Sequence, residues 1–289
     1  MLVLAGYLIV VCSVFGGFAL AGGHLAAMLQ PIELLMIGGA ALGSFLVGNP
    51  MKTLRATARA LPSVVKSSKY TKELYLELMA LLYEVLNKVR QEGLMSIETD
   101  IEAPHESALF NRYAKIQSDH HLVEFITDYM RMMVSGNLNA LEIEALMDHE
   151  IETHHHEGEV PAHAIQRTAD GLPAFGIVAA VMGVVHTMAS VGLPPQELGM
   201  LIAHALVGTL LGILLSYGFV APLASLLEQK LSESTKILQC VKVTLLASLN
   251  GYAPQIAVEF GRKVLFSTER PGFAELETHV KAAVKRPAA

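Results

Sequence analysis

Four long apolar blocks constrain the fold of this chain more than any other feature of its sequence. They cover residues 2–20, 32–47, 172–191 and 198–227. Each is close to the roughly 20 residues that a helix needs to cross about 30 Å of hydrocarbon, although the second block is short and rich in glycine. Hydrophobic residues make up 52% of the chain and are gathered into these blocks. The sequence therefore predicts an all-α integral membrane protein with four transmembrane helices.

The distribution of basic residues predicts which side of the membrane each connection faces. The long connection after the second block begins with Lys52, Arg55, Arg59, Lys66, Lys69 and Lys72, whereas residues 21–31 and 192–197 contain no Lys or Arg. Cytoplasmic loops carry such an excess of basic residues, so the long segment, the tail and both termini are expected in the cytoplasm. The first block ends in Ala19-Leu20-Ala21, which resembles a signal-peptide cleavage site, but no Lys or Arg precedes it and we interpret it as a helix.

The predicted organisation has four segments. Residues 1–50 hold transmembrane helices 1 and 2, residues 51–170 a large helical cytoplasmic domain, residues 171–227 transmembrane helices 3 and 4, and residues 228–289 a cytoplasmic helical tail. The two cysteines, Cys12 and Cys240, fit a reducing compartment and give no disulfide framework. A net charge of −6 without a basic stripe argues against binding to nucleic acid.

Helical periodicity and capping signals are clear in the cytoplasmic segment. The apolar residues Leu74, Leu78, Leu81, Val85 and Val89 recur at 3.6-residue spacing and predict an amphipathic helix that ends at Gly93. Ser96 is expected to cap the next helix. Asn139 followed by Glu142 has the form of a capping box before a further amphipathic helix. No run of strand alternation is convincing, which predicts an all-helical domain.

Stripes of small residues run along the third and fourth apolar blocks. The third carries Pro173, Gly176, Ala180, Gly183 and Thr187 at steps of three and four, and the fourth carries Ala205, Gly208, Thr209 and Gly212. Small residues let helix backbones approach closely in lipid, so packing alone is one interpretation. Packing alone does not explain two prolines at similar depth, Pro173 and Pro222. Each of them removes a backbone hydrogen bond and allows a hinge.

The four blocks contain hydroxyl groups but no central charge. Thr209, Ser216 and Tyr217 offer hydroxyls at different depths of the fourth block, although such groups commonly bond to their own helix or reach the interface. His186 and His204 lie toward the external ends of the third and fourth blocks. No Asp, Glu, Lys or Arg lies in the middle of any block. An ion path needs a titratable or charged group, so a chain that conducts would need a second polypeptide to supply the acid.

Other candidate sites are weaker. His154, His155 and His156 are consecutive, whereas metal ligands on one helix face need a spacing such as i, i+4, so adventitious metal binding is the simpler interpretation. Arg90 and Glu98 lie at helix ends, where each charge complements the local helix dipole. This stabilisation alone would account for the presence of both charges. The sequence shows no catalytic triad order, no nucleophilic-cysteine context and no phosphate-binding glycine loop. No enzymatic activity is predicted, and no cofactor.

Longer motifs link the whole chain to a known family. Residues 205–222 read Ala-Leu-x-Gly-Thr-Leu-x-Gly-x-Leu, then seven residues and a proline. "GYLIVVCSVFGGF", "LEIEALMDHEIETH", "LPAFGIVAAVMGVVH" and "LNGYAPQIAVEFGRKVLFSTERP" also occur in the order expected for that family. The chain resembles the MotA family, the A-subunit of the bacterial flagellar stator, in its proton-type Gram-negative branch.

This resemblance implies a function and a set of roles. It implies a homo-oligomeric ring of five A-subunits in the bacterial inner membrane, around a dimer of MotB-type B-subunits that supply a membrane aspartate and a peptidoglycan anchor. The implied ion path includes Thr209, Ala180 and Tyr217, and Pro173 and Pro222 would couple proton transfer to movement. Arg90 and Glu98, with Glu150 as a weaker candidate, would contact the rotor protein FliG. Ala180 favours protons, since sodium-driven relatives tend to carry threonine there.

Three alternatives stay open at this point. The first is an ExbB/TolQ-like energiser of an outer-membrane system, although those chains generally have three membrane helices. The second is a membrane scaffold, which would need neither paired prolines nor a hydroxyl at Thr209. The third is a metal-dependent membrane enzyme built on His154, His155 and His156.

Overall fold

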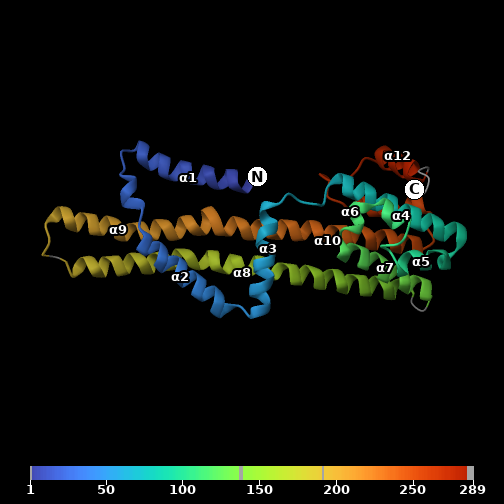
Figure 1. Cartoon of the computed structure of the whole chain (residues 1–289), viewed down its shortest axis with the longest axis horizontal. Coiled ribbons are helices and arrows are strands. Elements are labelled where there is room, and N and C mark those ends of the chain that lie inside the picture. The colour runs from blue at the N-terminus through green and yellow to red at the C-terminus, as the bar shows by residue number, and fades with distance from the viewer. Residues whose placement is uncertain (1, 137–138, 191, 285–289) are drawn as a thin grey trace. The chain divides into compact units, whose positions relative to one another are not determined.

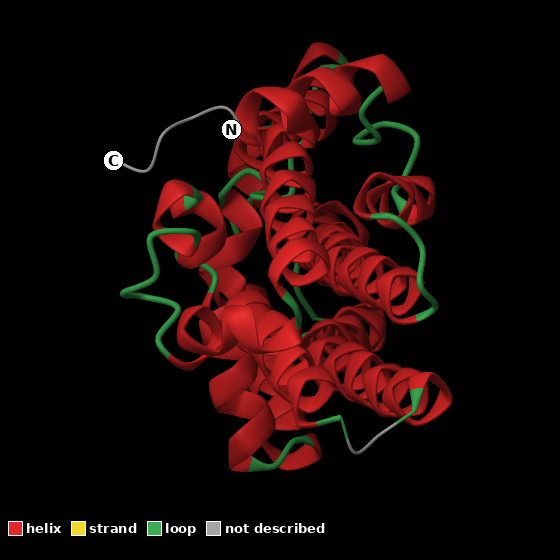
Figure 2. Ribbon diagram, turned by 90° about the vertical axis from the view of Figure 1, so that its right-hand side faces the viewer, coloured by secondary structure: helices red, strands yellow, loops and turns green. Residues whose placement is uncertain are grey.

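The computed structural model describes residues 2–136, 139–190 and 192–284, and these residues form helices joined by short loops (Figures 1 and 2). No strand occurs within these ranges, which confirms the prediction of an all-helical protein. The predicted third apolar block ends at Val191, which lies outside the described residues.

Helices long and apolar enough to span a membrane confirm the four predicted crossings. The candidate spans lie in α1 (Leu2–Leu20), in η1 with α2 (Leu25–Met28 and Pro31–Gly48), in α8 (Ala140–Met188), and in the run of α9 (Pro195–Ile213), the π-helical segment η4 (Leu214–Val220) and α10 (Ala221–Leu249). None of the residues of α1 is buried within the chain. An apolar helix with no buried residue needs lipid or another protein around it, which agrees with the predicted membrane protein.

The remaining helices lie outside these candidate spans. They are α3 (Met51–Val65), α4 (Lys72–Glu92), η2 (Leu94–Ile97), α5 (Glu98–Glu102), η3 (Phe110–Arg112), α6 (Ala114–Gln117), α7 (His120–Ser135), α11 (Pro254–Val264) and α12 (Phe273–Val284).

The chain divides into two compact units. The first unit holds Met1–Ser67 and Glu157–Lys230, and the second holds Ser68–His156 and Leu231–Ala289. These packing boundaries differ from the segment boundaries predicted at residues 50, 170 and 227. In the first unit, Val64 of α3 packs with Ala162 and Ile165 of α8 and with Ala224 of α10, so residues that flank the apolar blocks join the same core. Where the bilayer begins and ends along these helices stays a prediction.

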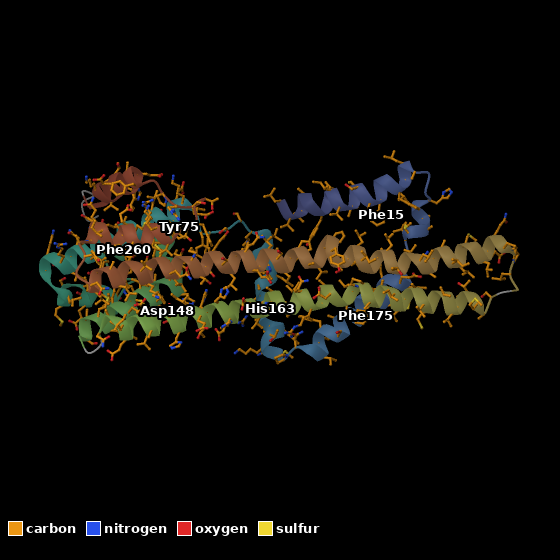
Figure 3. All side chains as sticks on the ribbon, turned by 180° about the vertical axis from the view of Figure 1, so that it is seen from behind. Phe15, Tyr75, Asp148, His163, Phe175 and Phe260 are labelled. Carbon is orange, nitrogen blue, oxygen red and sulfur yellow. The ribbon has the colours of Figure 1, made fainter. Side chains whose placement is uncertain are left out.

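The core of the second unit confirms the amphipathic helix predicted around residue 80. Leu78 and Leu81 of α4 are fully buried, and Leu74 and Val85 are almost so. The core also contains Tyr75, which Figure 3 labels and which is 2% exposed. Further members come from α7, α8, α10 and α11. Helix α4 ends as predicted at Gly93, whose φ of 88° suits glycine.

The two predicted helix caps have different outcomes. The capping box is confirmed, because the Asn139 side chain accepts from the Glu142 backbone N–H at 3.0 Å and the Glu142 carboxylate accepts from the Asn139 N–H at 2.8 Å. The prediction for Ser96 is wrong. Its hydroxyl donates instead to the Gly93 carbonyl at 2.7 Å. The chain turns through η2 before α5 begins, so Ser96 lies inside the turn and α5 has no side-chain cap.

Candidate functional site

The small-residue stripes of α8 and α9 face each other. A Cβ atom placed on Gly212 would lie 2.7 Å from the Leu172 carbonyl oxygen and 2.8 Å from the Gly176 Cα. A Cβ on Gly176 would lie 2.8 Å from the Gly208 carbonyl oxygen, and one on Gly183 would lie 2.7 Å from the Ala205 Cβ. We call the contact of Gly176 and Gly183 with Ala205, Gly208 and Gly212 the glycine seam. Its backbones meet directly, with no room for a side chain between them.

Thr209 and Ala180 flank the glycine seam. Both are half-buried, and a Cβ on Gly208 would lie 3.3 Å from the Ala180 backbone nitrogen. In the described part of the chain the Thr209 hydroxyl makes no hydrogen bond. It differs in this from Thr187, whose hydroxyl donates to the Gly183 carbonyl of its own helix at 2.8 Å. The Thr209 hydroxyl is therefore free to bind a group from outside this chain.

Tyr217 and Pro222 lie together, away from Thr209. Both line a groove of about 500 Å³ whose other wall is formed by α1 residues such as Val3 and Tyr7. The Tyr217 side chain is 67% exposed, and it lies about 12 Å along the helix from Thr209 at 1.5 Å per residue. The structure thus places the three predicted path residues at two levels, with Thr209 and Ala180 at the glycine seam and Tyr217 in the groove beside α1.

The segment before Pro222 is π-helical, which the sequence analysis did not predict. Residues Leu214–Val220 form this segment, and α10 continues directly from it. The Tyr7 hydroxyl of α1 donates to the Phe219 carbonyl at 2.9 Å, and the two rings are 4.9 Å apart. π-Helical turns occur often at functional sites, and the only local sequence signal for this one is Pro222 itself. Pro173 is half-buried inside α8, where it interrupts the backbone bonding of that helix.

One carboxylate in the spans escaped the sequence analysis. Glu33 lies in the first turn of α2, and its Oε2 atom is buried without a hydrogen-bond partner. It is at a helix end, so the prediction that the middle of each span lacks a charged residue stands. A single Glu inside an otherwise apolar block was the available signal.

Arg90 and Glu98 are exposed on either side of the turn that joins α4 to α5. Neighbouring charges are paired, since Lys88 contacts Asp100 at 2.8 Å and Arg131 contacts Glu102 at 3.0 Å. Over residues 2–136, 139–190 and 192–284, neither the Arg90 side chain nor the Glu98 side chain makes a hydrogen bond or an ion pair. Both charges are available to a partner.

Glu150 differs from these two residues because it has a partner in its own unit. It is exposed on α8 and accepts a hydrogen bond from the Tyr129 hydroxyl at 2.8 Å. Burial raises the pKa of the Tyr129 phenol, and the hydrogen bond to Glu150 raises that pKa further. Glu150 therefore helps to hold α7 against α8, which makes it the weaker candidate for an external contact.

The consecutive histidines contact α10. His154 Nε2 lies 3.2 Å from the Ser234 hydroxyl, and His155 Nδ1 lies 3.1 Å from the Thr235 hydroxyl. No group of three or more His, Cys, Asp or Glu side chains suited to a metal ion occurs among the described residues.

Comparison with known proteins assigns the chain to a family. Residues 4–93 match the model described as motility protein A N-terminal, and residues 117–240 match that of the MotA/TolQ/ExbB proton channel family. The chain is 58% identical to the motility protein A of Salmonella typhimurium, over 99% of this chain and 97% of the relative. The chain belongs to the motility protein A family. Motility protein A of Escherichia coli shows the same identity and the same coverage.

Solved structures support the fold of this motility protein A family member. A chain of MotAB from C. jejuni superposes with a TM-score of 0.77 at 20% identity, covering 92% of this chain and 95% of that one. A chain of the flagellar MotAB stator complex from Bacillus subtilis gives a TM-score of 0.72 at 24% identity, covering 89% and 92%. At these identities the likeness shows the fold, which agrees with the predicted all-α membrane architecture. The motility protein A relatives also favour a motor subunit over an energiser or an enzyme.

Proposed function

We propose that this chain is the A-subunit of a bacterial flagellar stator, which forms a proton channel with a MotB-type B-subunit and converts proton flow into torque on the rotor. The structural observation that carries the proposal is the unpartnered Thr209 hydroxyl beside the glycine seam, in spans without a central charge. Such a site is complete only when another polypeptide brings a carboxylate to it. The full-length likeness to motility protein A supports the same function.

The proton path would use a carboxylate of the partner. A membrane aspartate of the B-subunit would take up a proton, lose its charge and release the proton toward the cytoplasm, because its pKa responds to burial and to nearby polar groups. Each proton that crosses releases about 2.3 kcal/mol per 100 mV of membrane potential. Thr209 and Ala180 would line this path at one level and Tyr217 at another. We propose no cofactor, and the proton is the transported species.

The exposed apolar surface supports an assembly in the bacterial inner membrane. Helix α1 has no buried residue, so other copies of this chain, the B-subunit or lipid would cover it. We propose a ring of five copies with both termini in the cytoplasm, as the basic residues of the long connection indicate. Arg90 and Glu98 would face FliG, and Glu150 would be a weaker contact. The family match and the four candidate spans favour this function over an ExbB/TolQ-like energiser.

The proposed channel can be tested in vesicles. The tagged chain would be extracted gently from its native membrane and the proteins that copurify identified. We expect a single-span protein with a membrane aspartate and a peptidoglycan-binding domain. Vesicles that contain the purified pair should take up protons when a potential is applied, and the same pair with that aspartate changed to asparagine should not. Recovery of a TonB-type assembly, or equal uptake by both preparations, would contradict the proposal.

The two prolines should matter for movement and not for assembly. We expect Pro173→Ala and Pro222→Ala each to reduce rotation speed, because alanine restores a backbone N–H and stiffens the helix where it bends. Speed would be measured with tethered cells that carry equal amounts of membrane-inserted protein. Pro62→Ala, in α3, is the matched control and should leave speed unchanged. Full-speed rotation by both variants would exclude the hinge.

A further inference from the structure

The Ser216 side chain makes a hydrogen bond that the serine and threonine side chains of the spans do not usually make. It is fully buried in η4, and its hydroxyl donates to the Ala169 carbonyl of α8 at 2.6 Å, 47 residues away along the chain. Thr168 and Thr187 instead donate to carbonyls four residues earlier in their own helix. Ser216 thus connects two helices, whereas these threonines act within one.

The acceptor of this bond is the carbonyl that Pro173 leaves without a backbone donor. In an α-helix the carbonyl of residue 169 accepts from the N–H of residue 173, and proline has no N–H. Ala169 is fully buried, so water cannot replace the missing donor, and an unpaired buried carbonyl destabilises the fold. The Ser216 hydroxyl occupies the position where a donor is needed.

The glycine seam brings Ser216 within reach of this carbonyl. Gly212 lies one turn before Ser216 on the same face, and its backbone touches Leu172 and Gly176 of α8. The helix then widens into η4, from which Ser216 reaches Ala169. The hydrogen bond therefore links the proline break in α8 to the π-helical segment that leads into Pro222.

We propose that Ser216 is a positioning residue, which replaces the backbone donor missing at Pro173 and so ties the two proline sites together by one hydrogen bond. This inference rests on the proposed coupling role of Pro173 and Pro222. Loss of the hydroxyl would let α8 bend at Pro173 independently of η4. Movement at one proline would then reach the other less completely, and each assembled stator would deliver less torque.

A double-mutant cycle measured by thermal unfolding, here called the thermal cycle, tests the hydrogen bond without reference to motor function. Ser216→Ala in the complex with the B-type partner should lower the unfolding midpoint by about 3 °C. In a Pro173→Ala background the residue-173 N–H returns to the Ala169 carbonyl, so the same substitution should lower the midpoint by less than half as much. Equal decreases in both backgrounds would show that Ser216 only packs. The matched control is Thr187→Ala, which removes a buried hydroxyl from a carbonyl that keeps its backbone donor. Its effect should be the same in both backgrounds.

A second measurement separates positioning from stability. Tethered motors regain speed in steps as stators are added one at a time, and the step height reports torque per stator. We expect Ser216→Ala to reduce the step height at least twofold, and Ser216→Cys, a weaker donor of similar size, to give an intermediate height. Steps of normal height in smaller number would assign Ser216 a purely structural role. Absence of any steps from the unaltered chain would refute the motor function, and the thermal cycle would still decide the hydrogen bond.

Discussion

Replacement of Gly212 by valine is expected to remove nearly all of the folded protein from the membrane. A Cβ atom at this position would meet two backbone atoms of α8, the Leu172 carbonyl oxygen at 2.7 Å and the Gly176 Cα at 2.8 Å. Backbone cannot rotate aside as a side chain can, so α8 and α9 must separate along the glycine seam. Overpacking of a well-packed core costs about 1–3 kcal/mol, and a clash between backbones lies at the upper end or above it.

The measurement compares the amount of membrane-inserted protein and its copurification with the B-type partner. The matched control is Gly199→Val in the same helix, because a Cβ on Gly199 has nothing within 4 Å. We expect this control to keep the amount of the unaltered chain. Wild-type amounts of the Gly212→Val protein would show that the two helices do not meet at this glycine.

Reversal of both charges in Arg90→Glu with Glu98→Lys should reduce rotation about tenfold or more, with the protein still in the membrane. Both side chains are exposed, and within the described residues neither has an intramolecular partner, so their reversal should change the free energy of unfolding by little. A complementary charged surface on the rotor would instead be repelled. Proton uptake by vesicles that contain this variant should stay normal.

A charge swap elsewhere on the second unit serves as the control. Lys281 and Glu277 form an exposed ion pair at 2.6 Å on α12. Exchanging them preserves net charge, as the Arg90 and Glu98 reversal does, and should leave rotation unchanged. Normal torque from the Arg90→Glu, Glu98→Lys variant would remove these residues from the rotor contact. Impaired proton uptake would show that they act on the channel.

Periodicity predicted the parts of the fold that depend on a single helix. The buried face of α4 and the reciprocal cap of Asn139 and Glu142 follow from local spacing, and the structure confirms both. The small-residue stripes of α8 and α9 could be recognised in the sequence, with helix packing as one interpretation, but the sequence did not predict that they meet each other. Ser96 was misplaced because an extra turn, η2, precedes α5. No local pattern distinguishes that turn from a helix start.

Features that depend on two distant segments could not be predicted in this way. The pairing of Ser216 with Ala169 needs both the missing N–H of Pro173 and the close approach at Gly212, which are 39 residues apart in sequence. The π-helical segment, which Tyr7 of α1 contacts, and the buried Glu33 oxygen were likewise not predicted. The roles given to Thr209, Ala180, Tyr217 and the prolines came from family resemblance. The geometry adds that Thr209 and Tyr217 lie at separate levels.

The close contact along the glycine seam has a consequence for whether protons can leak through a single copy of this chain. Water enters a protein interior only where there is space and polar groups to hold it, and backbones in direct contact leave no space. With no charge in the middle of the spans, a single copy of this chain offers a proton no place to stop between the two sides of the membrane. We therefore expect a single copy of this chain, without its partner, not to conduct protons across the membrane.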